Sequence, residues 1–194
     1  MMERIMFEVK KAIEFKGHVV IAIDGRAGAG KTTFANELAD LLCGEIVPMD
    51  HFFLPPELRT EDRLSQPGGN VHYERFAKEV LPHLHQPEAF SYTRFDCQIM
   101  DYNGQRPLRP CPSQASFRIV EGSYSHHPAL GDYADVFVFS HVDSENQMKR
   151  ILHRNGPQMA QMFETRWIPM EEAYFLAYSI QESSQVTIDT THLF

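Results

Sequence analysis

Gly25-Arg26-Ala27-Gly28-Ala29-Gly30-Lys31-Thr32-Thr33 matches the pattern G-x-x-x-x-G-K-[ST] in full. The β-branched run at residues 19–23 precedes this segment, and apolar residues at helical spacing follow it, namely Phe34, Leu38, Leu41 and Leu42. A strand, a glycine-rich turn and a helix N-terminus in this order direct backbone N–H groups and the helix dipole to one place. The segment is therefore predicted to bind the phosphates of a nucleoside triphosphate.

Individual residues of this segment suit different parts of that ligand. Gly25, Gly28 and Gly30 permit positive φ and a close approach of the backbone to an anion. Lys31 can reach the β- and γ-phosphates, and the Thr32 hydroxyl is a suitable ligand for Mg²⁺. The alternative is a glycine-rich turn that matches by chance, which the correct strand and helix on either side disfavour. We predict ATP and Mg²⁺ as cofactors.

Size, charge and cysteine content limit the possible functions. The chain has 194 residues, the length of one domain, and a net charge of −8 from 18 basic and 26 acidic residues, which argues against a broad nucleic-acid-binding face. The three cysteines, Cys43, Cys97 and Cys111, are far apart and are typical of reduced thiols in a cytoplasmic protein. No apolar run approaches the length of about 20 residues that a membrane span needs. The sequence leaves the oligomeric state open, a homo-oligomer included.

Strand-like and helix-like segments alternate along the chain, which predicts an α/β fold with a parallel sheet and crossover helices. We expect strands near residues 19–23, 45–49, 117–120, 136–139 and 186–188. We expect helices at residues 2–13 (packed on the domain rather than on a membrane surface), 31–43 with Gly44 as the stop signal, 73–84, 144–155 with a Ser144–Gln147 capping box and an end at Asn155-Gly156-Pro157, and 169–180.

The segment between the second and third predicted strands of the sheet is different in character. Residues 51–70 contain several prolines and glycines and are expected to be irregular. Residues 86–116 are predicted to form a flap with strands near 90–96 and 105–108, and Asn103-Gly104 is the expected hairpin turn. We therefore predict a single domain over residues 1–194, with a nucleotide-binding core at 16–50 and 117–194 and an acceptor-binding helix and flap at 51–116.

Two acidic residues follow predicted strands at the edge where parallel sheets bind ligands. Asp50 follows the second strand and Glu121 the third. Phosphoryl transfer needs a group that accepts the proton of the acceptor hydroxyl and an acid near Mg²⁺, so Asp50 suits the first role and Glu121 the second. The alternatives are a helix N-cap for Asp50 and an ordinary acidic strand end for Glu121.

Several basic residues lie close together in the sequence after the fourth predicted strand, and they could contact the triphosphate. Arg150 and Arg154 are four residues apart, so they share one helix face and could close over the phosphates; Lys149 and Arg166 are further candidates. A solvated helix face is the alternative. Glu74, near the start of its helix, could be favoured by the helix dipole or bind ligand hydroxyls. The histidine pairs 83/85 and 126/127 lack the additional ligands that a zinc site needs.

The ordered set of these segments resembles the uridine kinase and phosphoribulokinase branch of P-loop kinases, over nearly the whole chain after the first helix. The segments are the phosphate loop, Met49-Asp50-His51-Phe52-Phe53, Phe95-Asp96-Cys97, Val120-Glu121-Gly122 and Arg150-Ile151-Leu152-His153-Arg154-Asn155. The resemblance implies a P-loop fold with a β-hairpin flap and a helical lid, and a kinase that phosphorylates a small-molecule hydroxyl.

The resemblance also implies roles for residues. Asp50 stands at the position of the catalytic base, and Glu121 stands at the position of the acid that supports Mg²⁺. Arg150 and Arg154 match the arginines of a lid helix that contacts the phosphates, and Lys31 belongs to the phosphate loop. Glu74 stands where an acid binds ribose hydroxyls, although the usual residue there is Asp. The acceptor-binding candidates are therefore Asp50, Phe53, Glu74, Phe95, Asp96 and Arg166.

One position of the flap departs from the uridine kinase pattern. Met100 stands where that family usually has a histidine, and a methionine cannot donate a hydrogen bond to a base carbonyl. The acceptor could therefore be a nucleoside or another hydroxyl compound, such as a sugar phosphate or a pantothenate-like compound. A P-loop nucleotide-binding switch or ATPase adaptor is the alternative from another class.

Overall fold

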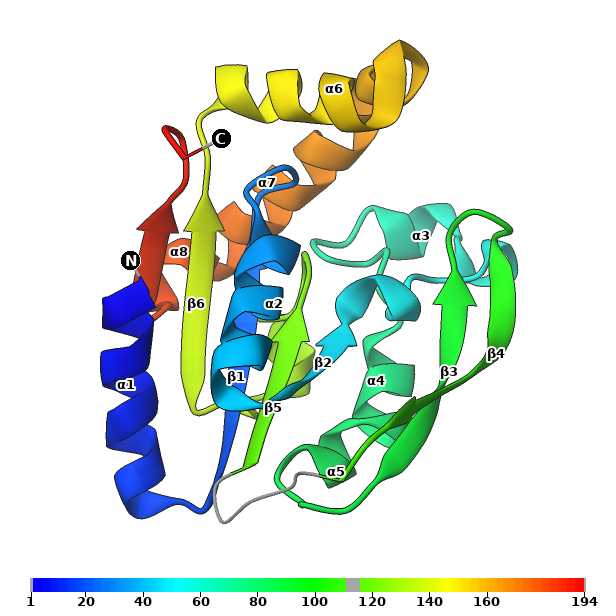
Figure 1. The fold of residues 1–194 in the computed structure, drawn as a ribbon. Helices are drawn as coiled ribbons and strands as arrows, with labels where there is room; N and C mark the ends of the chain where they lie inside the picture. The colour runs from blue at the N-terminus through cyan, green and yellow to red at the C-terminus, as the bar shows by residue number, and fades with distance from the viewer. Residues whose placement is uncertain (1, 111–115, 194) are drawn as a thin grey trace.

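The computed structural model describes residues 2–110 and 116–193. Its centre is a five-stranded sheet of parallel strands in the order β2-β5-β1-β6-β7 (Figure 1). The predicted α/β fold with a parallel sheet is confirmed. The strands are β1 (His18–Gly25), β2 (Glu45–Pro48), β5 (Ser116–Glu121), β6 (Val136–His141) and β7 (Val186–Asp189).

The central strand β1 is buried on both faces, which explains its continuous apolar sequence. Successive side chains of a strand point to opposite faces. Val20 and Ala22 accordingly pack into one apolar core, whereas Val19, Ile21 and Ile23 pack into the other. The two cores lie on the two sides of the sheet.

Helices cover both faces of the sheet (Figure 1). Ile5 and Val9 of the first helix and Leu38 of the second enter the core of Ile21, so the first helix packs on the domain as expected. Phe76 and Tyr174 come from helices on the other face. The helices are α1 (Met2–Phe15), α2 (Lys31–Leu42), α4 (Tyr73–Glu79), α5 (Leu81–Leu84), α6 (Ser144–Met162), α7 (Ile168–Tyr178) and α8 (Ile180–Ser183), with a π-helical turn η4 (Phe163–Trp167) before α7 and a 3₁₀ turn η3 (Pro128–Leu130).

Two predicted helix signals were wrong in detail. Cys43, not Gly44, takes the left-handed conformation that ends α2, with φ 52°. Asp143, not Ser144, caps α6, because the Asp143 side chain accepts a hydrogen bond from the Asn146 N–H at 2.7 Å. A carboxylate one residue earlier reaches this N–H and replaces the predicted capping box.

Other helices are longer or more interrupted than predicted. The helix α6 is interrupted at the predicted Asn155-Gly156-Pro157, because Gly156 is non-helical, with φ 77° and ψ 171°, and a second helical segment follows this kink as far as Met162. The predicted helix at 73–84 divides at Val80 into α4 and α5, because Pro82 cannot donate a helical hydrogen bond. Ser179, with φ 48°, likewise separates α7 from α8.

Residues 49–110, which we call the arm, leave the sheet after β2 and return before β5. The arm begins with irregular chain and short helical turns, as expected for residues 51–70, and ends in an antiparallel hairpin that forms the predicted flap (Figure 1). Its remaining elements are η1 (Met49–Phe52), η2 (Pro56–Leu58), α3 (Glu61–Leu64), β3 (Phe90–Asp96) and β4 (Asp101–Leu108).

The hairpin turn is not at Asn103-Gly104, as predicted, but at residues 97–100. Met100 takes a left-handed conformation there, with φ 56°. Asn103 and Gly104 lie within β4, opposite Arg94, where the pairing register shifts by a β-bulge; Gly104 has φ 69°. A glycine with positive φ suits a bulge as well as a turn. The Asn103-Gly104 pattern therefore correctly indicated a positive φ, but at a bulge rather than at the hairpin turn.

Among residues 2–110 and 116–193, no helix is long and apolar enough to cross a membrane. Cys43 and Cys97 are free thiols, whereas Cys111 lies outside the described residues.

Candidate active site

The phosphate loop joins β1 to α2 at the carboxyl edge of the sheet. Gly28 and Gly30 have φ of 72° and 76°, which only glycine adopts without strain. Gly30 is the N-cap of α2 and has no side chain to cap the first amides of that helix. The Lys31 ammonium donates to the Gly25 and Arg26 carbonyl oxygens at 2.7 and 2.9 Å, so it lies over the loop. The backbone of the loop thus has the geometry that the anion-cradle prediction requires, and its binding of phosphates stays a prediction.

Thr32 and Glu121 meet beside the loop. The Thr32 hydroxyl lies 3.2 Å from Glu121 Oε2, and burial, followed by the charge of Asp50, raises the pKa of the Glu121 carboxyl. Hydroxyl and carboxylate oxygens are ligands that Mg²⁺ accepts, with phosphate oxygens and water completing its shell. The pair therefore fits the predicted magnesium position. Within the described residues no group of three or more His, Cys, Asp and Glu side chains could hold a metal on its own.

Asp50 lies in η1, directly after β2, and its carboxyl packs against the end of β5. A Cβ atom added to Gly122 would lie 3.5 Å from Asp50 Oδ1, an ordinary contact, but only 2.9 Å from Met49 Cβ. Gly122, with φ 132°, therefore lies close against Met49 and Asp50 at the start of η1. Asp50 is exposed at the protein surface, but the protein atoms packed around its carboxyl remove solvating water and so raise its pKa. The charges of Lys31 and Arg154 act in the opposite direction and lower it. The structure thus brings Asp50 to Glu121 and Lys31, as the sequence predicted for strand ends.

Asp24, a residue that the sequence reasoning missed, holds the chain after β5 in place. Its carboxylate is fully buried at the end of β1. It accepts hydrogen bonds from the Gly25, Tyr124 and His126 N–H groups at 2.7, 3.1 and 2.9 Å and from the Tyr174 hydroxyl at 2.9 Å. An acid inside an otherwise apolar strand, one residue before the loop, is the signal that could have indicated it.

Two buried side chains grip the phosphate loop from behind, and they too were missed. Glu171 of α7 accepts from the Ala27 N–H at 3.0 Å. Gln147 of α6 donates to the Ala27 carbonyl oxygen at 3.1 Å. Both backbone polar groups of one loop residue are thereby satisfied by helices distant in sequence. Gln147 was expected only in a capping box with Ser144, and nothing local in the sequence indicates that either residue contacts the loop.

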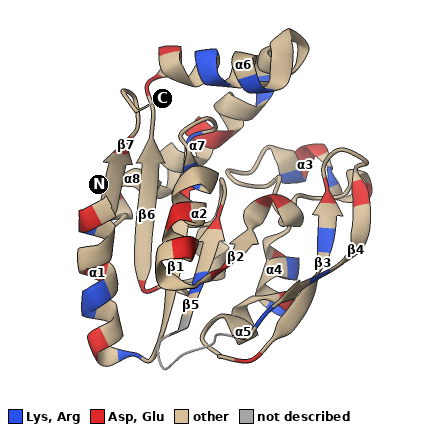
Figure 2. Ribbon diagram, viewed as in Figure 1, with Lys and Arg blue, Asp and Glu red and all other residues tan. Residues whose placement is uncertain are grey.

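The two lid arginines have different surroundings. Arg150 donates to the Gly28 carbonyl oxygen at 3.1 Å and to the Thr190 carbonyl oxygen at 2.6 Å, so it joins α6 to the loop and to the segment after β7. Arg154 is exposed one turn further on, bonded to Asn155 at 2.8 Å, and its charge acts on Asp50. Figure 2 shows the positive residues of α6, the helix that runs above the loop. Their contact with phosphates stays a prediction.

Glu74, the predicted ligand for acceptor hydroxyls, is engaged by an arginine. Arg63 of α3 pairs with both of its carboxylate oxygens, at 2.7 and 3.0 Å, and lies over the Tyr73 ring at 4.1 Å. Arg63 also donates to the Gly69 and Val71 carbonyl oxygens at 2.9 and 3.0 Å. Sequence reasoning did not identify Arg63, which organises the irregular part of the arm.

The remaining acceptor candidates lie in several environments. Phe95 is buried and packs edge-to-face on Tyr102, and Phe53 packs similarly on Tyr124. Asp96 accepts from the Gln98 N–H and the Asn103 amide, so its oxygens stabilise the hairpin turn. Arg166 is exposed on η4. The roles of these residues and of Glu74 in binding an acceptor stay predictions.

The histidine pairs have structural contacts. The His127 ring stacks on Tyr73, with ring centroids 4.5 Å apart, and His126 bonds to the Ala22 carbonyl oxygen at 3.2 Å. His85 bonds to the Tyr133 carbonyl oxygen at 2.9 Å. The rings are therefore used in packing and in bonds to the backbone.

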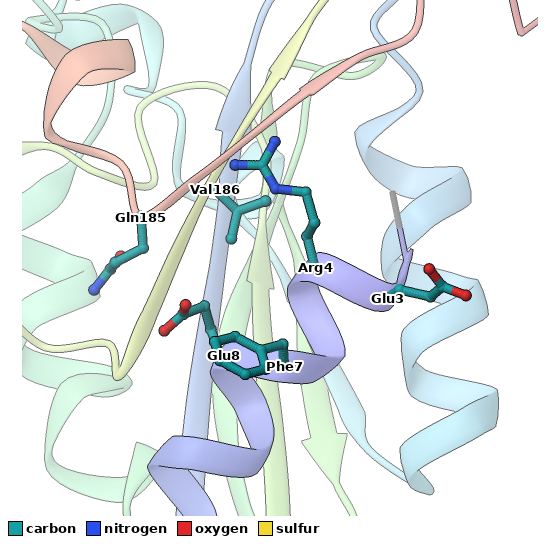
Figure 3. A pocket seen from close by; sticks show the side chains of 6 residues that line it. All are labelled: Glu3, Arg4, Phe7, Glu8, Gln185 and Val186. Atoms are coloured by element: carbon teal, nitrogen blue, oxygen red, sulfur yellow. The ribbon is translucent and has the colours of Figure 1, made fainter.

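A pocket of about 350 Å³ lies away from this site, between the N-terminal helix α1 and the edge strand β7 (Figure 3). Its lining mixes the charged side chains of Glu3, Arg4 and Glu8 with the Phe7 ring. The pocket contains none of the loop residues and none of the predicted site residues.

Comparison with known proteins agrees on the fold. No family model and no curated protein sequence matches the chain. A possible uridine kinase from Bacillus stearothermophilus has a similar structure, with a TM-score of 0.69 and 19% identity over 96% of this chain and 98% of that chain. A putative fructose transport system kinase from Silicibacter sp. TM1040 superposes with a TM-score of 0.70 and 21% identity over 94% of this chain and 96% of that chain. The chain therefore shares the fold of these two structures, in agreement with the fold that the resemblance to the uridine kinase branch implied.

Proposed function

We propose that the chain is an ATP-dependent kinase that transfers a γ-phosphoryl group to a hydroxyl of a small metabolite, with a nucleoside as the first acceptor class. The convergence of three features at one sheet edge carries this proposal: the Lys31 ammonium over the loop, the Thr32–Glu121 pair, and the Asp50 carboxyl against Gly122. Phosphoryl transfer consists mainly of positioning and charge stabilisation, and these groups supply both.

Each residue has a part in the transfer. The loop amides and Lys31 hold the polyphosphate. Asp50 accepts the proton of the acceptor hydroxyl while the acceptor oxygen bonds to the γ-phosphorus and the bond to the β-phosphate oxygen breaks. The protein around Asp50 raises the pKa of its carboxyl, which makes it a better base. Bound Mg²⁺, next to Thr32 and Glu121, would neutralise phosphate charge. Arg154 stabilises the charge that develops in the transition state.

The two structural neighbours support the proposal of a small-molecule kinase, because each is named as a kinase. For the acceptor itself, the flap is the informative region. Met100 occupies the left-handed position of the hairpin turn, where uridine kinases usually have a histidine. Because its thioether donates no hydrogen bond, a sugar phosphate or a pantothenate-like compound is the second candidate class.

The test is an acceptor panel. The purified protein is incubated with Mg·ATP and with nucleosides, sugar phosphates and pantothenate-like compounds, and the products are identified by mass spectrometry. A kinase produces ADP together with one phosphorylated acceptor. ADP formation that is equally fast without any acceptor would instead favour the nucleotide-binding switch or ATPase adaptor.

Replacement of the base tests the role of Asp50. Asp50→Asn should lower kcat about 10²–10⁴-fold, because the amide cannot accept the proton, while the Kd for ATP measured by calorimetry stays within about threefold. Asp62→Asn, an exposed acid of α3 in the same arm, is the matched control and should leave kcat unchanged. A near-normal kcat for Asp50→Asn would refute the assignment.

A further inference from the structure

Glu171 is a buried carboxylate that the transfer step described above does not use. It lies at the start of α7, behind the phosphate loop, and its residue is only 6% exposed. A charge buried to this extent is costly unless hydrogen bonds compensate for it. Its two oxygens have separate partners: Oε2 accepts from the Ala27 N–H at 3.0 Å, and Oε1 accepts from the Ser123 hydroxyl at 2.7 Å. Both partners border the phosphate site.

The contact with Ala27 fixes the orientation of the loop. In a nest of this type the backbone N–H groups follow one another closely, and each N–H points either into the anion site or away from it. The Ala27 N–H points to Glu171, and its carbonyl oxygen accepts from Gln147 at 3.1 Å. With the two peptide groups on either side of the Ala27 Cα held in this way, the later amides of the loop keep their direction before any phosphate arrives.

The contact with Ser123 extends to the loop lysine. Lys31 Nζ lies 3.3 Å from the Ser123 hydroxyl oxygen, and this hydroxyl in turn lies 2.7 Å from Glu171. The charge of Lys31, together with the bonds from Ser123 and Ala27, lowers the pKa of Glu171 against the larger raising effect of burial. One carboxylate is therefore linked to both the amide cradle and the ammonium group that receive the phosphates.

We propose that Glu171 is a positioning residue that pre-orients the phosphate loop and, through Ser123, Lys31 for the polyphosphate of the nucleotide. The inference rests on the proposed function, since it assigns the loop to a nucleoside triphosphate. It adds a residue of α7, more than a hundred positions from the loop in sequence, to the determinants of nucleotide affinity.

The experiment measures the Kd of Mg·ATP and of inorganic tripolyphosphate by calorimetry. Glu171→Ala should raise both Kd values at least about tenfold, because the Ala27 N–H loses its acceptor and the loop must be ordered during binding. Glu171→Gln should restore both to within about threefold of the wild-type values, because an amide can accept from Ala27 and donate to Ser123. This rescue is not expected if a negative charge alone matters.

Two further variants complete the design. Glu182→Ala, an exposed acid of α8, is the matched control and should leave both Kd values within about twofold. Ser123→Ala keeps the Ala27 contact and removes the link to Lys31, so it should raise the Kd of tripolyphosphate about threefold or more. Ser123→Ala and Glu171→Gln also keep the test decisive if Glu171→Ala does not fold, as judged by circular dichroism.

The outcomes separate this inference from the proposed function. Wild-type protein that binds neither Mg·ATP nor tripolyphosphate would refute the proposed function itself. Wild-type protein that binds both, together with a Glu171→Ala variant of unchanged affinity, would overturn the positioning role alone. A Glu171→Gln variant as weak as Glu171→Ala would overturn it as well, as would an unchanged tripolyphosphate Kd for Ser123→Ala.

Discussion

The phosphate loop and the arm are each stabilised by charged side chains that bond to the backbone, but the sign of the charge differs between the two regions. Around the loop, the buried carboxylates of Asp24 and Glu171 accept hydrogen bonds from backbone N–H groups. In the arm, Arg63 and Arg75 donate to backbone carbonyl oxygens, at Gly69 and Val71 and at His51 and Thr93 respectively.

The difference follows from the backbone of each region. A glycine turn that leads into a helix N-terminus leaves N–H groups without partners, and carboxylates satisfy those that do not face the ligand. The arm consists of irregular chain and a two-stranded hairpin whose strands each have one unpaired edge, so carbonyl oxygens in it need donors. A guanidinium supplies five donors in a fixed plane. We infer that the sign of a buried charge indicates which half of the peptide group a region leaves unsatisfied.

The largest effect is expected at Asp24. Asp24→Ala removes one acceptor from four donors at once, so the free energy of unfolding should fall by about 3–5 kcal/mol. Urea denaturation measures the loss. Asp40→Ala, an exposed acid on α2, is the control and should cost less than about 0.5 kcal/mol. A loss below about 1 kcal/mol at Asp24 would show that carboxylates do not hold the loop region.

The same comparison explains what could be predicted from the sequence. Strands, loop and strand-end acids are local signals: apolar runs, glycines at fixed spacing, and acids where a run ends. Asp50 and Glu121 were found in this way. Glu171 was not, because its partner Ala27 lies 144 positions away and only the folded chain brings the two together. A buried charged residue that bonds to a backbone group far away in the sequence is not part of any periodic pattern or fixed spacing, so the sequence does not indicate it.

In the flap, the turn preference of Asn103-Gly104 did not determine where the hairpin turns. Asn103-Gly104 is typical of a two-residue hairpin turn. Asp96, however, accepts from the Gln98 N–H at 2.9 Å and from the Asn103 side chain at 3.0 Å, and so stabilises a longer turn at 97–100. The glycine is then used in a bulge. Side-chain acceptors of this kind compete with turn preferences and decide the register.

Arg75 offers the second test, because it is the buried cation of the arm. Its residue is 8% exposed, and it joins η1 to the flap by bonds to the His51 and Thr93 carbonyl oxygens while it lies over the Phe52 ring at 4.2 Å. Arg75→Met keeps the packing of the stem and leaves the carbonyl oxygens unpaired, so unfolding free energy should fall by about 2–4 kcal/mol.

Lys78→Met on the exposed side of the same helix is the matched control for Arg75. It should change the unfolding free energy by less than about 0.5 kcal/mol. If the two variants lose equal stability, the arm does not depend on a buried guanidinium, and the contrast with the loop is lost. Arg75→Met should in addition lower kcat, since η1 carries Asp50 next to His51.

The smallest effect is expected at His51, which lies between Asp50 and the arginines of the arm. Burial, followed by the charges of Arg106, Arg94 and Arg75, lowers its pKa to about 4, against the weaker opposite effect of Asp96. Its Nδ1 lies 2.8 Å from the Tyr92 hydroxyl, a contact that suits a neutral ring. In the unfolded chain the same imidazole should titrate near its ordinary pKa of about 6.5.

The sign of the pH dependence follows from this lowered pKa. Above about pH 6.5 the ring is neutral in both states and carries no penalty. As the pH falls toward 4, the unfolded chain binds a proton that the folded protein rejects, so the folded state loses stability over this window. NMR titration should give His51 a midpoint of about 4, and His51→Gln should reduce the loss of stability between pH 6.5 and 4. A midpoint near 6.5 would mean that neither burial nor the arginines of the arm disfavour the charged form of the ring beside Asp50.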